Sequence, residues 1–179
     1  RYVYWVRFTA PGEGLDVVSE TGQFRTTPAG GAARPLSLVW WGDLGGGLYC
    51  RDPERGYAIF TQMARVMPDF AIANGDSIYA DRACPPVTSL PNHPRNLLSP
   101  DPETAALQLV PATDPRWKTE AEVLAAYRAK WEYNLEDEAF RRFRAQTPHF
   151  FQWDDHEVLN DWYPGEDRVG ALRGTQDLR

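Results

Sequence analysis

Three short, mainly apolar runs stand out along the chain, at residues 36–41, 70–74 and 149–153. Continuous apolar runs of this kind are typical of strands buried on both faces, as in parallel sheets. Each run is followed directly by a segment that contains aspartate. The pattern therefore predicts three buried strands that each end at acidic residues.

Between these runs, apolar residues recur at three- and four-residue steps, which predicts helices. Asp52 and Pro53 are typical of a helix start, and Pro68 is expected to end that helix. A second helix is predicted to begin near Thr119 and a third near Glu138. Strands that alternate with helices favour an α/β fold, with a mixed, largely parallel sheet and flanking helices.

The first part of the chain has a different pattern. Residues 2–8 are apolar on both faces, and short strands are predicted near residues 17–18 and 23–26. Because two or three strands do not close a core, residues 1–27 are interpreted as the end of a small β-sandwich domain or as strands docked on the α/β part of the chain. Residues 28–35, rich in Pro, Gly and Ala, are interpreted as a linker.

Residues 82–117 are crowded with prolines and have no clear periodicity. They are predicted to form a long loop that either shapes a site or moves. His93 lies in this segment and is expected to be exposed to solvent.

The composition is that of a globular protein, with 42% hydrophobic and 25% charged residues among 179. No apolar run is long enough to span a membrane, and any export signal is expected to lie outside this chain. The net charge of −6 has the wrong sign for a general nucleic-acid or anionic-membrane binder. A phosphate substrate would therefore need metal ions or local arginines.

The chain has two cysteines, Cys50 and Cys84. In an exported protein they could form one disulfide, and in the cytosol they would be two buried thiols. Residue types and spacing alone leave both possibilities open.

The acidic residues after the three predicted strands are Asp43, Asp76 and Asp155, the last followed by His156. Ligand sites of parallel sheets lie beyond the carboxyl ends of the strands, so these side chains are expected to meet at one edge. Like charges gathered there are costly unless a cation lies between them. The sequence therefore predicts a site for one or two metal ions.

Some of these residues also fit a structural role. An aspartate directly after a strand is often a turn former, which applies to Asp43 and Asp76 taken singly. The run Asp154–Glu157 is different, because four consecutive ionisable residues have no evident packing use. His149, beside a proline at a strand start, is expected to be structural.

Several motifs together resemble a known family. They are the segments 41–43 (WGD), 68–70 (PDF), 74–81 (NGDSIYAD), 152–158 (QWDDHEV) and 160–165 (NDWYPG). In this order they resemble the alkaline phosphatase D (PhoD-like) family of calcineurin-like metallophosphoesterases. The resemblance implies a four-layer α+β catalytic domain preceded by a β-sandwich, with residues 36–179 as the N-terminal half of that domain.

The resemblance also implies roles for individual residues. Asp43, Asp76, Tyr79 and Asp155 match metal ligands, with Asp76 bridging two ions. His156 matches the histidine that contacts the phosphate and assists the leaving group. Two metal ions are implied, and Ca²⁺, Fe³⁺ and Mn²⁺ all fit such an oxygen-rich set.

The chain departs from the family pattern in two places. Gly45 stands where the wider superfamily has a histidine, and no histidine follows His156. Further ligands of the family would come from a later segment. The chain is therefore expected to be part of a longer protein. The resemblance implies that this protein is exported, to the periplasm, the cell wall or the medium.

The leading hypothesis is a metal-dependent phosphoesterase that acts on phosphodiesters, with phosphomonoesters as a second substrate class. The substrate would be a small-molecule or polymeric phosphoester. A non-catalytic binding module on the same scaffold is the main alternative, and a lactonase or esterase with a carboxylate-rich metal site is a third. Oligomeric state cannot be read from the sequence.

Overall fold

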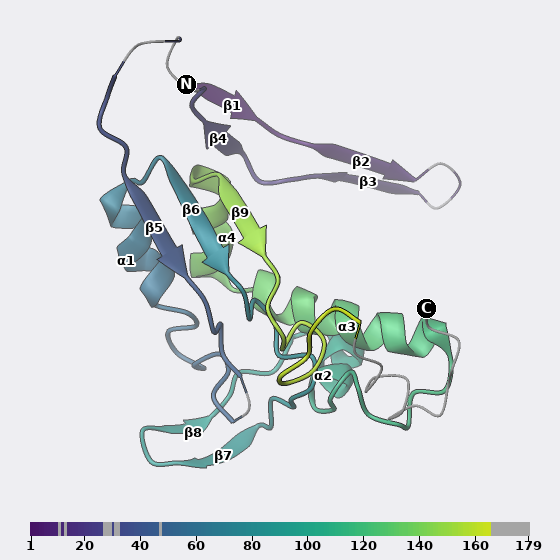
Figure 1. Ribbon diagram of the computed structural model, residues 1–179. Helices are drawn as coiled ribbons and strands as arrows, with labels where there is room; N and C mark the ends of the chain where they lie inside the picture. Colours follow the sequence, from purple (N-terminus) through teal and green to yellow (C-terminus); the bar gives the residue numbers. More distant parts are fainter. Residues whose placement is uncertain (11, 13, 27–29, 31–32, 47, 166–179) are drawn as a thin grey trace.

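A parallel sheet of three strands is the centre of the structure. The computed structural model describes residues 1–10, 12, 14–26, 30, 33–46 and 48–165. Strands β5 (Leu38–Trp41), β6 (Phe70–Asn74) and β9 (His149–Gln152) are hydrogen-bonded in that order, with β6 in the middle. All three point the same way and end at the same edge (Figure 1). The three strands predicted from the apolar runs are confirmed.

Helices α1 (Ile59–Val66) and α4 (Glu138–Gln146) pack against each other and cover one face of this sheet (Figure 1). The core between them is aromatic, and the rings of Phe60 and Phe140 stack with centroids 4.4 Å apart. Small residues on β6 leave room for these rings. The buried members of the cluster are Trp41, Leu44, Tyr57, Phe60, Ala71, Ala73, Phe140 and Phe143.

The opposite face of the sheet also carries large apolar side chains, but in the described part of the chain no helix packs on them. Successive strand side chains point to opposite faces, so Trp40 and Phe150 point away from the helices. Their exposed fractions are 69% and 63%, and Leu38 beside them is also exposed. Among the described residues, the three-stranded sheet therefore has a helix layer on one face.

The start of α1 corrects the sequence prediction, which placed it at Asp52. The Asp52 carboxylate instead accepts hydrogen bonds from the backbone N–H groups of Glu54 and Arg55, in a turn that ends at Gly56. Gly56 has φ +54°, and a Cβ there would lie 2.0 Å from Oδ2 of Asp137. The buried carboxylate of Asp137 therefore lies directly against Gly56, where no side chain would fit.

Asp137 also connects two helical segments. Its Oδ1 caps α4 by accepting from the N–H of Phe140, as expected for a helix that begins at Glu138. Its Oδ2 accepts from the N–H of Tyr57, just ahead of α1. One carboxylate thus sets where both helices begin.

Helix α3 (Glu120–Leu135) begins where the sequence predicts. Thr119 and Glu122 form a capping box, in which each side chain accepts a hydrogen bond from the other residue's backbone N–H. The helix packs on α2 (Pro102–Gln108), which is capped by Asp101.

The segment 82–117 is not the structureless loop that its prolines suggest. Besides α2, it contains the antiparallel pair β7 (Val87–Leu90) and β8 (His93–Arg95). The expectation that His93 is exposed is also wrong, because its ring is buried and its Nε2 lies 2.6 Å from the side-chain oxygen of Asn96.

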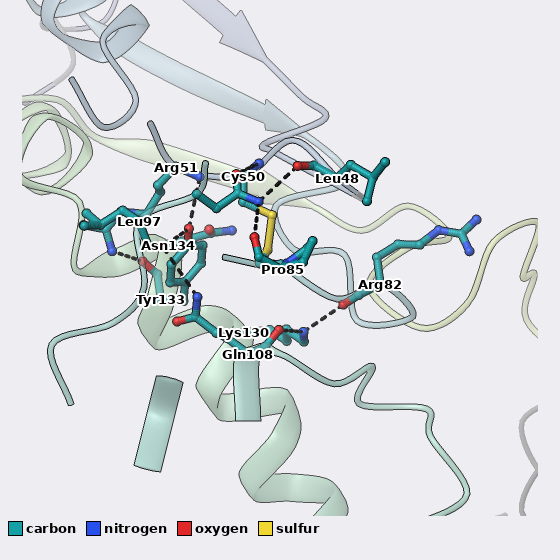
Figure 2. The surroundings of a disulfide bond; sticks show 12 residues. Leu48, Cys50, Arg51, Arg82, Pro85, Leu97, Gln108, Lys130, Tyr133 and Asn134 are labelled. Atoms are coloured by element: carbon teal, nitrogen blue, oxygen red, sulfur yellow. Dashed lines mark hydrogen bonds between the residues drawn. A yellow bond between two sulfur atoms is a disulfide. The ribbon is translucent and has the colours of Figure 1, made fainter. Parts of the chain in front are cut away.

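A disulfide between Cys50 and Cys84 joins the loop after β5 to the segment after β6 (Figure 2). The Asn96 amide group donates to the carbonyl oxygens of Leu48 and Pro85, one on each side of this bridge. Of the two possibilities left open by the sequence, the structure thus contains the disulfide. This bond connects two loops that follow strand ends.

A buried lysine lies beneath the same loops (Figure 2). The Lys130 ammonium group donates to the carbonyl oxygens of Arg82 and Gln108. Burial lowers the pKa of Lys130 to about 8. Its hydrogen bonds hold the chain just beyond the Asp76–Asp81 segment.

The N-terminal strands form a ribbon of two antiparallel pairs, one joining β1 (Tyr2–Tyr4) to β4 (Gly22–Phe24) and one joining β2 (Arg7–Ala10) to β3 (Leu15–Val18). The β1–β4 end lies near α4 (Figure 1). Assignment of residues 1–27 to a β-sandwich domain stays a prediction, and the predicted linker at 28–35 lies partly outside the described residues.

No helix in the described ranges has the length and apolar character needed to cross a lipid bilayer.

Asp69 gives a test of how the segment before β5 is attached. Its carboxylate accepts two hydrogen bonds from the Arg34 guanidinium and one from the N–H of Ser37. The bond to Arg34 is the main reason that the pKa of Asp69 is lowered to about 2. A carboxyl with a lowered pKa stabilises the folded state above its ordinary pKa, and this contribution is lost as the pH falls through the lowered value.

We therefore expect Asp69→Asn to lower Tm at pH 6, and the difference from the wild type to shrink between about pH 4 and pH 2. Thermal unfolding followed by circular dichroism across this range checks the expectation. A difference that stays constant down to pH 2 would contradict it.

Candidate metal centre

The candidate site lies at the edge of the sheet where β5, β6 and β9 end. Asp43 and Asp76 each follow directly on a strand–glycine step and have φ of +53° and +49°. Positive φ is uncommon for residues other than glycine, and such backbone strain often marks functional positions. Both strands therefore turn sharply at the aspartate that the sequence singles out.

Three of the predicted site residues form a compact cluster. Asp76, Asp155 and His156 each offer one potential ligand atom, and these atoms lie within 4.8 Å of one another. Oδ1 of Asp76 is buried and has no hydrogen-bond partner in the described part of the chain. Burial is the main reason that the pKa of Asp76 is raised. A buried carboxylate oxygen without a donor fits a cation ligand, because a cation would supply the missing positive partner.

Tyr79 connects this cluster to Asp43. The Tyr79 hydroxyl donates to Oδ1 of Asp43 at 3.3 Å, and its ring lies 4.3 Å from the imidazole of His156, centroid to centroid. Burial, followed by the neighbouring carboxyl of Asp76, raises the pKa of Tyr79 above its ordinary value. The structure thus brings all five predicted site residues together, and their individual roles stay predictions.

Asp155 comes from the third strand end and is held by the segment behind it. Its Oδ2 accepts a hydrogen bond from the backbone N–H of Asp161. Asn160, whose N–H donates to Asp81, and Asp161 thus lie close to the cluster.

One residue of the site escaped sequence reasoning. Oδ1 of Asp81 lies 2.7 Å from Nδ1 of His156, and Oδ2 of Asp81 accepts from the N–H of Asn160. The Asp81 side chain is almost fully buried. A carboxylate at Nδ1 keeps the proton on that nitrogen and fixes the ring, which leaves Nε2 for a metal ion or a phosphate. The signal available in the sequence is its place five residues after Asp76.

The comparisons with known proteins give the family and the fold of the chain. Residues 45–178, most of the chain, match the family model of PhoD-like phosphatases. The chain belongs to the PhoD-like phosphatase family. A solved structure described as "Structure of PhoD" has a similar fold, with a TM-score of 0.54 and 22% sequence identity. The match covers 95% of this chain and 28% of the solved chain. No curated protein matches.

The PhoD-like chain holds two of its strand ends together through one carboxylate. Glu157, which is 1% exposed, accepts hydrogen bonds from the backbone N–H groups of Asp76, Ser77, Ile78 and Asp154. The expectation that the run Asp154–Glu157 has no packing use is therefore wrong for Glu157. Its charge is balanced by amide dipoles rather than by a cation, so its place is behind the site.

Gly75 shows how closely the β6 and β9 ends of this PhoD-like chain approach. It has φ +84°, and a Cβ there would lie 2.3 Å from Cβ of Asp154. Only glycine fits both the conformation and the space. The glycine in the G-D motif is therefore required by the contact between two strand ends.

Glu157→Gln tests the role of the buried carboxylate. A glutamine offers one acceptor oxygen and places an amide N–H₂ against backbone donors, so some buried N–H groups lose their partner. We expect the free energy of unfolding to fall by about 2–4 kcal/mol, measured by urea denaturation.

Glu54→Gln is the matched control, because Glu54 is exposed, and it should change stability little. Equal effects of the two substitutions would show that Glu157 does not hold the two strand ends together.

Asp81→Asn tests the orientation of His156. In the metal-free protein we expect neutral His156 to carry its proton on Nδ1. With asparagine at position 81, whose amide can donate to Nδ1, we expect the Nε2–H tautomer to predominate. Two-dimensional ¹H–¹⁵N spectra of the histidine rings distinguish the two tautomers. The same tautomer in both proteins would contradict the assignment.

Proposed function

We propose that this chain forms the metal-binding part of a metal-dependent phosphoesterase that hydrolyses phosphodiesters, with phosphomonoesters as a second substrate class. The observation that carries the proposal is the donorless, buried oxygen of Asp76 beside Asp155 and His156. Membership of the PhoD-like phosphatase family supports a phosphatase activity at the level of the family. Because the chain spans 28% of the solved relative, the activity is proposed for the complete protein.

Asp76 and Asp155 would hold the metal ions, with Asp43 and Tyr79 beside them as further ligands. Metal ions bound there would supply positive charge for the phosphoryl oxygens and a water of lowered pKa for attack on phosphorus. Ca²⁺, Mn²⁺ and Fe³⁺ each suit a set made of carboxylate and phenol oxygens. The cluster of carboxylates itself repels a phosphate, so it needs such a cation to bind one.

His156 would act on the leaving group. Its Nδ1 faces Asp81, which holds the ring and aims Nε2 away from that carboxylate. Nε2–H would donate its proton to the ester oxygen as the bond from that oxygen to phosphorus breaks. Asp81 is a positioning residue in this scheme, because it acts through the histidine.

We also propose that the protein works outside the cytoplasm. A disulfide is typical of oxidising compartments, and Cys50 and Cys84 form one here. Mass spectrometry with and without reductant tests the bridge.

A non-catalytic binding module is the second candidate function. The exposed aromatic side chains of Trp153 and Tyr163 lie on the segments that flank the cluster residues in sequence, and each is 63% exposed. Aromatic surface beside a phosphate-binding edge would suit binding without turnover. A lactonase or esterase would use the same edge, and substrate profiling separates it from a phosphoesterase.

The decisive experiment uses the complete protein that contains this chain, with Asp76→Asn as the variant and Asp16→Asn as the matched control. Asp16 lies on the exposed N-terminal ribbon, where it pairs with Arg7. Loss of the Asp76 carboxylate should remove metal, measured by plasma mass spectrometry, and should lower hydrolysis of bis-p-nitrophenyl phosphate by roughly 100-fold or more.

The control should keep both metal and activity. An Asp76→Asn protein with full metal content and full hydrolysis would overturn the proposal. Metal and phosphoester binding without any turnover of the wild type would favour the binding module.

A further inference from the structure

A cavity of about 530 Å³ lies between the loop after β5 and the start of α1. This volume is within the range of small-molecule sites, roughly 300–1,000 Å³. Its lining comes from both segments, and the apolar side chains that expose surface on it include Tyr49, Ile59 and the partly buried Met63. None of these residues has a role in the metal centre described above.

The cavity adjoins the candidate metal centre at Asp43. Asp43 lines the cavity, and its Oδ1 accepts the hydrogen bond from Tyr79. Gly46 lines it as well, and a Cβ on Gly46 would lie 2.3 Å from the Tyr79 ring. A group bound in the cavity would therefore lie next to Asp43 and close to Tyr79.

The charges at the cavity argue against a second anionic group. Arg55 is the cation among the described lining residues, and it already pairs with Asp52. The Arg55 side chain is 71% exposed, so it lies at the mouth rather than within. An anion would therefore find no unpaired cation on the described lining, whereas a neutral apolar group would meet the aromatic and aliphatic walls.

The side chains that line the cavity are also held in place, which favours selective binding over non-specific binding. The ring of Tyr49 lies against the buried ring of His93, with centroids 4.1 Å apart. The Tyr57 hydroxyl donates to the side-chain oxygen of Asn134. A cavity with fixed aromatic walls accepts a planar ring at low entropic cost.

We propose that this cavity holds the organic substituent of the phosphoester, and that this substituent is a neutral, apolar group at least as large as one aromatic ring. The proposal rests on the proposed function for the position of the phosphate. The preferred substrates would then be phosphodiesters in which the ester group that is not cleaved carries such an apolar group.

The first test compares two diesters with the same leaving group, phenyl p-nitrophenyl phosphate and methyl p-nitrophenyl phosphate, on the complete metal-loaded protein. We expect kcat/KM to favour the phenyl diester roughly tenfold or more, because burial of a ring contributes more than burial of a methyl group. Ala58→Phe fills the cavity from its exposed rim and should reduce this ratio to about threefold or less.

Ala121→Phe is the matched control, because Ala121 is exposed on α3 and far along the chain from the cavity. It should leave the ratio unchanged. The methyl diester should be cleaved about equally by all three proteins. If Ala58→Phe fails to fold, Tyr49→Ala takes its place and should also reduce the ratio.

The second test measures binding alone. Isothermal titration calorimetry of phenylphosphonate and methylphosphonate should show roughly tenfold tighter binding of the phenyl compound to the wild type, and near-equal binding to Ala58→Phe. Hydrolysis of both diesters without a phenyl preference would overturn the cavity proposal and leave the phosphoesterase standing. If neither diester is cleaved, the proposed function fails, and equal binding of the two phosphonates would overturn the cavity as well.

Discussion

The carboxylate of Glu157 is the interaction on which the geometry of the site depends. Backbone N–H groups after β6 and after β9 converge on its two oxygens. The hydrogen bonds of the sheet stop at the strand ends, so they do not hold the residues that follow the strands close to one another. A buried carboxylate with several amide donors supplies the missing connection, and it does so just behind Asp76 and Asp155. The acidic residues in front can then be brought close to one another without a direct attraction between them.

Two other ties act at the same edge. The Cys50–Cys84 disulfide joins the loop from β5 to the segment from β6, and Asp137 fixes the start of both sheet-covering helices. Each tie joins residues that are far apart in sequence. Together with Glu157 they make the edge a cross-linked unit, which suits a site whose ligands come from three separate strands.

The parts of the fold that sequence reasoning predicted correctly are those with local causes. The capping box at Thr119 and the apolar run at 70–74 carry their signal within a few residues. The start of α1 depends instead on a carboxylate 80 residues away in sequence, at Asp137, and no local pattern shows it. The short elements within 82–117 are missed because prolines obscure their periodicity.

The same distinction holds for the site. The rule that strands of a parallel sheet end at one edge is enough to place Asp43, Asp76, Asp155 and His156 together. Tyr79 enters only through the family resemblance, because an aromatic residue after a strand has many uses. Asp81 and Glu157 act through hydrogen bonds to other parts of the site, so their functions become visible only when the chain is folded.

The uncovered face of the sheet has a consequence for the energetics of the site. Within the described part of the chain Trp40 and Phe150 are exposed, and each square ångström of apolar surface left exposed there forgoes about 25 cal/mol of stabilisation. The strained turns at Asp43 and Asp76 draw on the same limited stability. Any layer placed over Trp40 and Phe150 would therefore make those turns more persistent. The stability of the turns that carry the acidic residues therefore depends partly on a face of the sheet that has no contact with them.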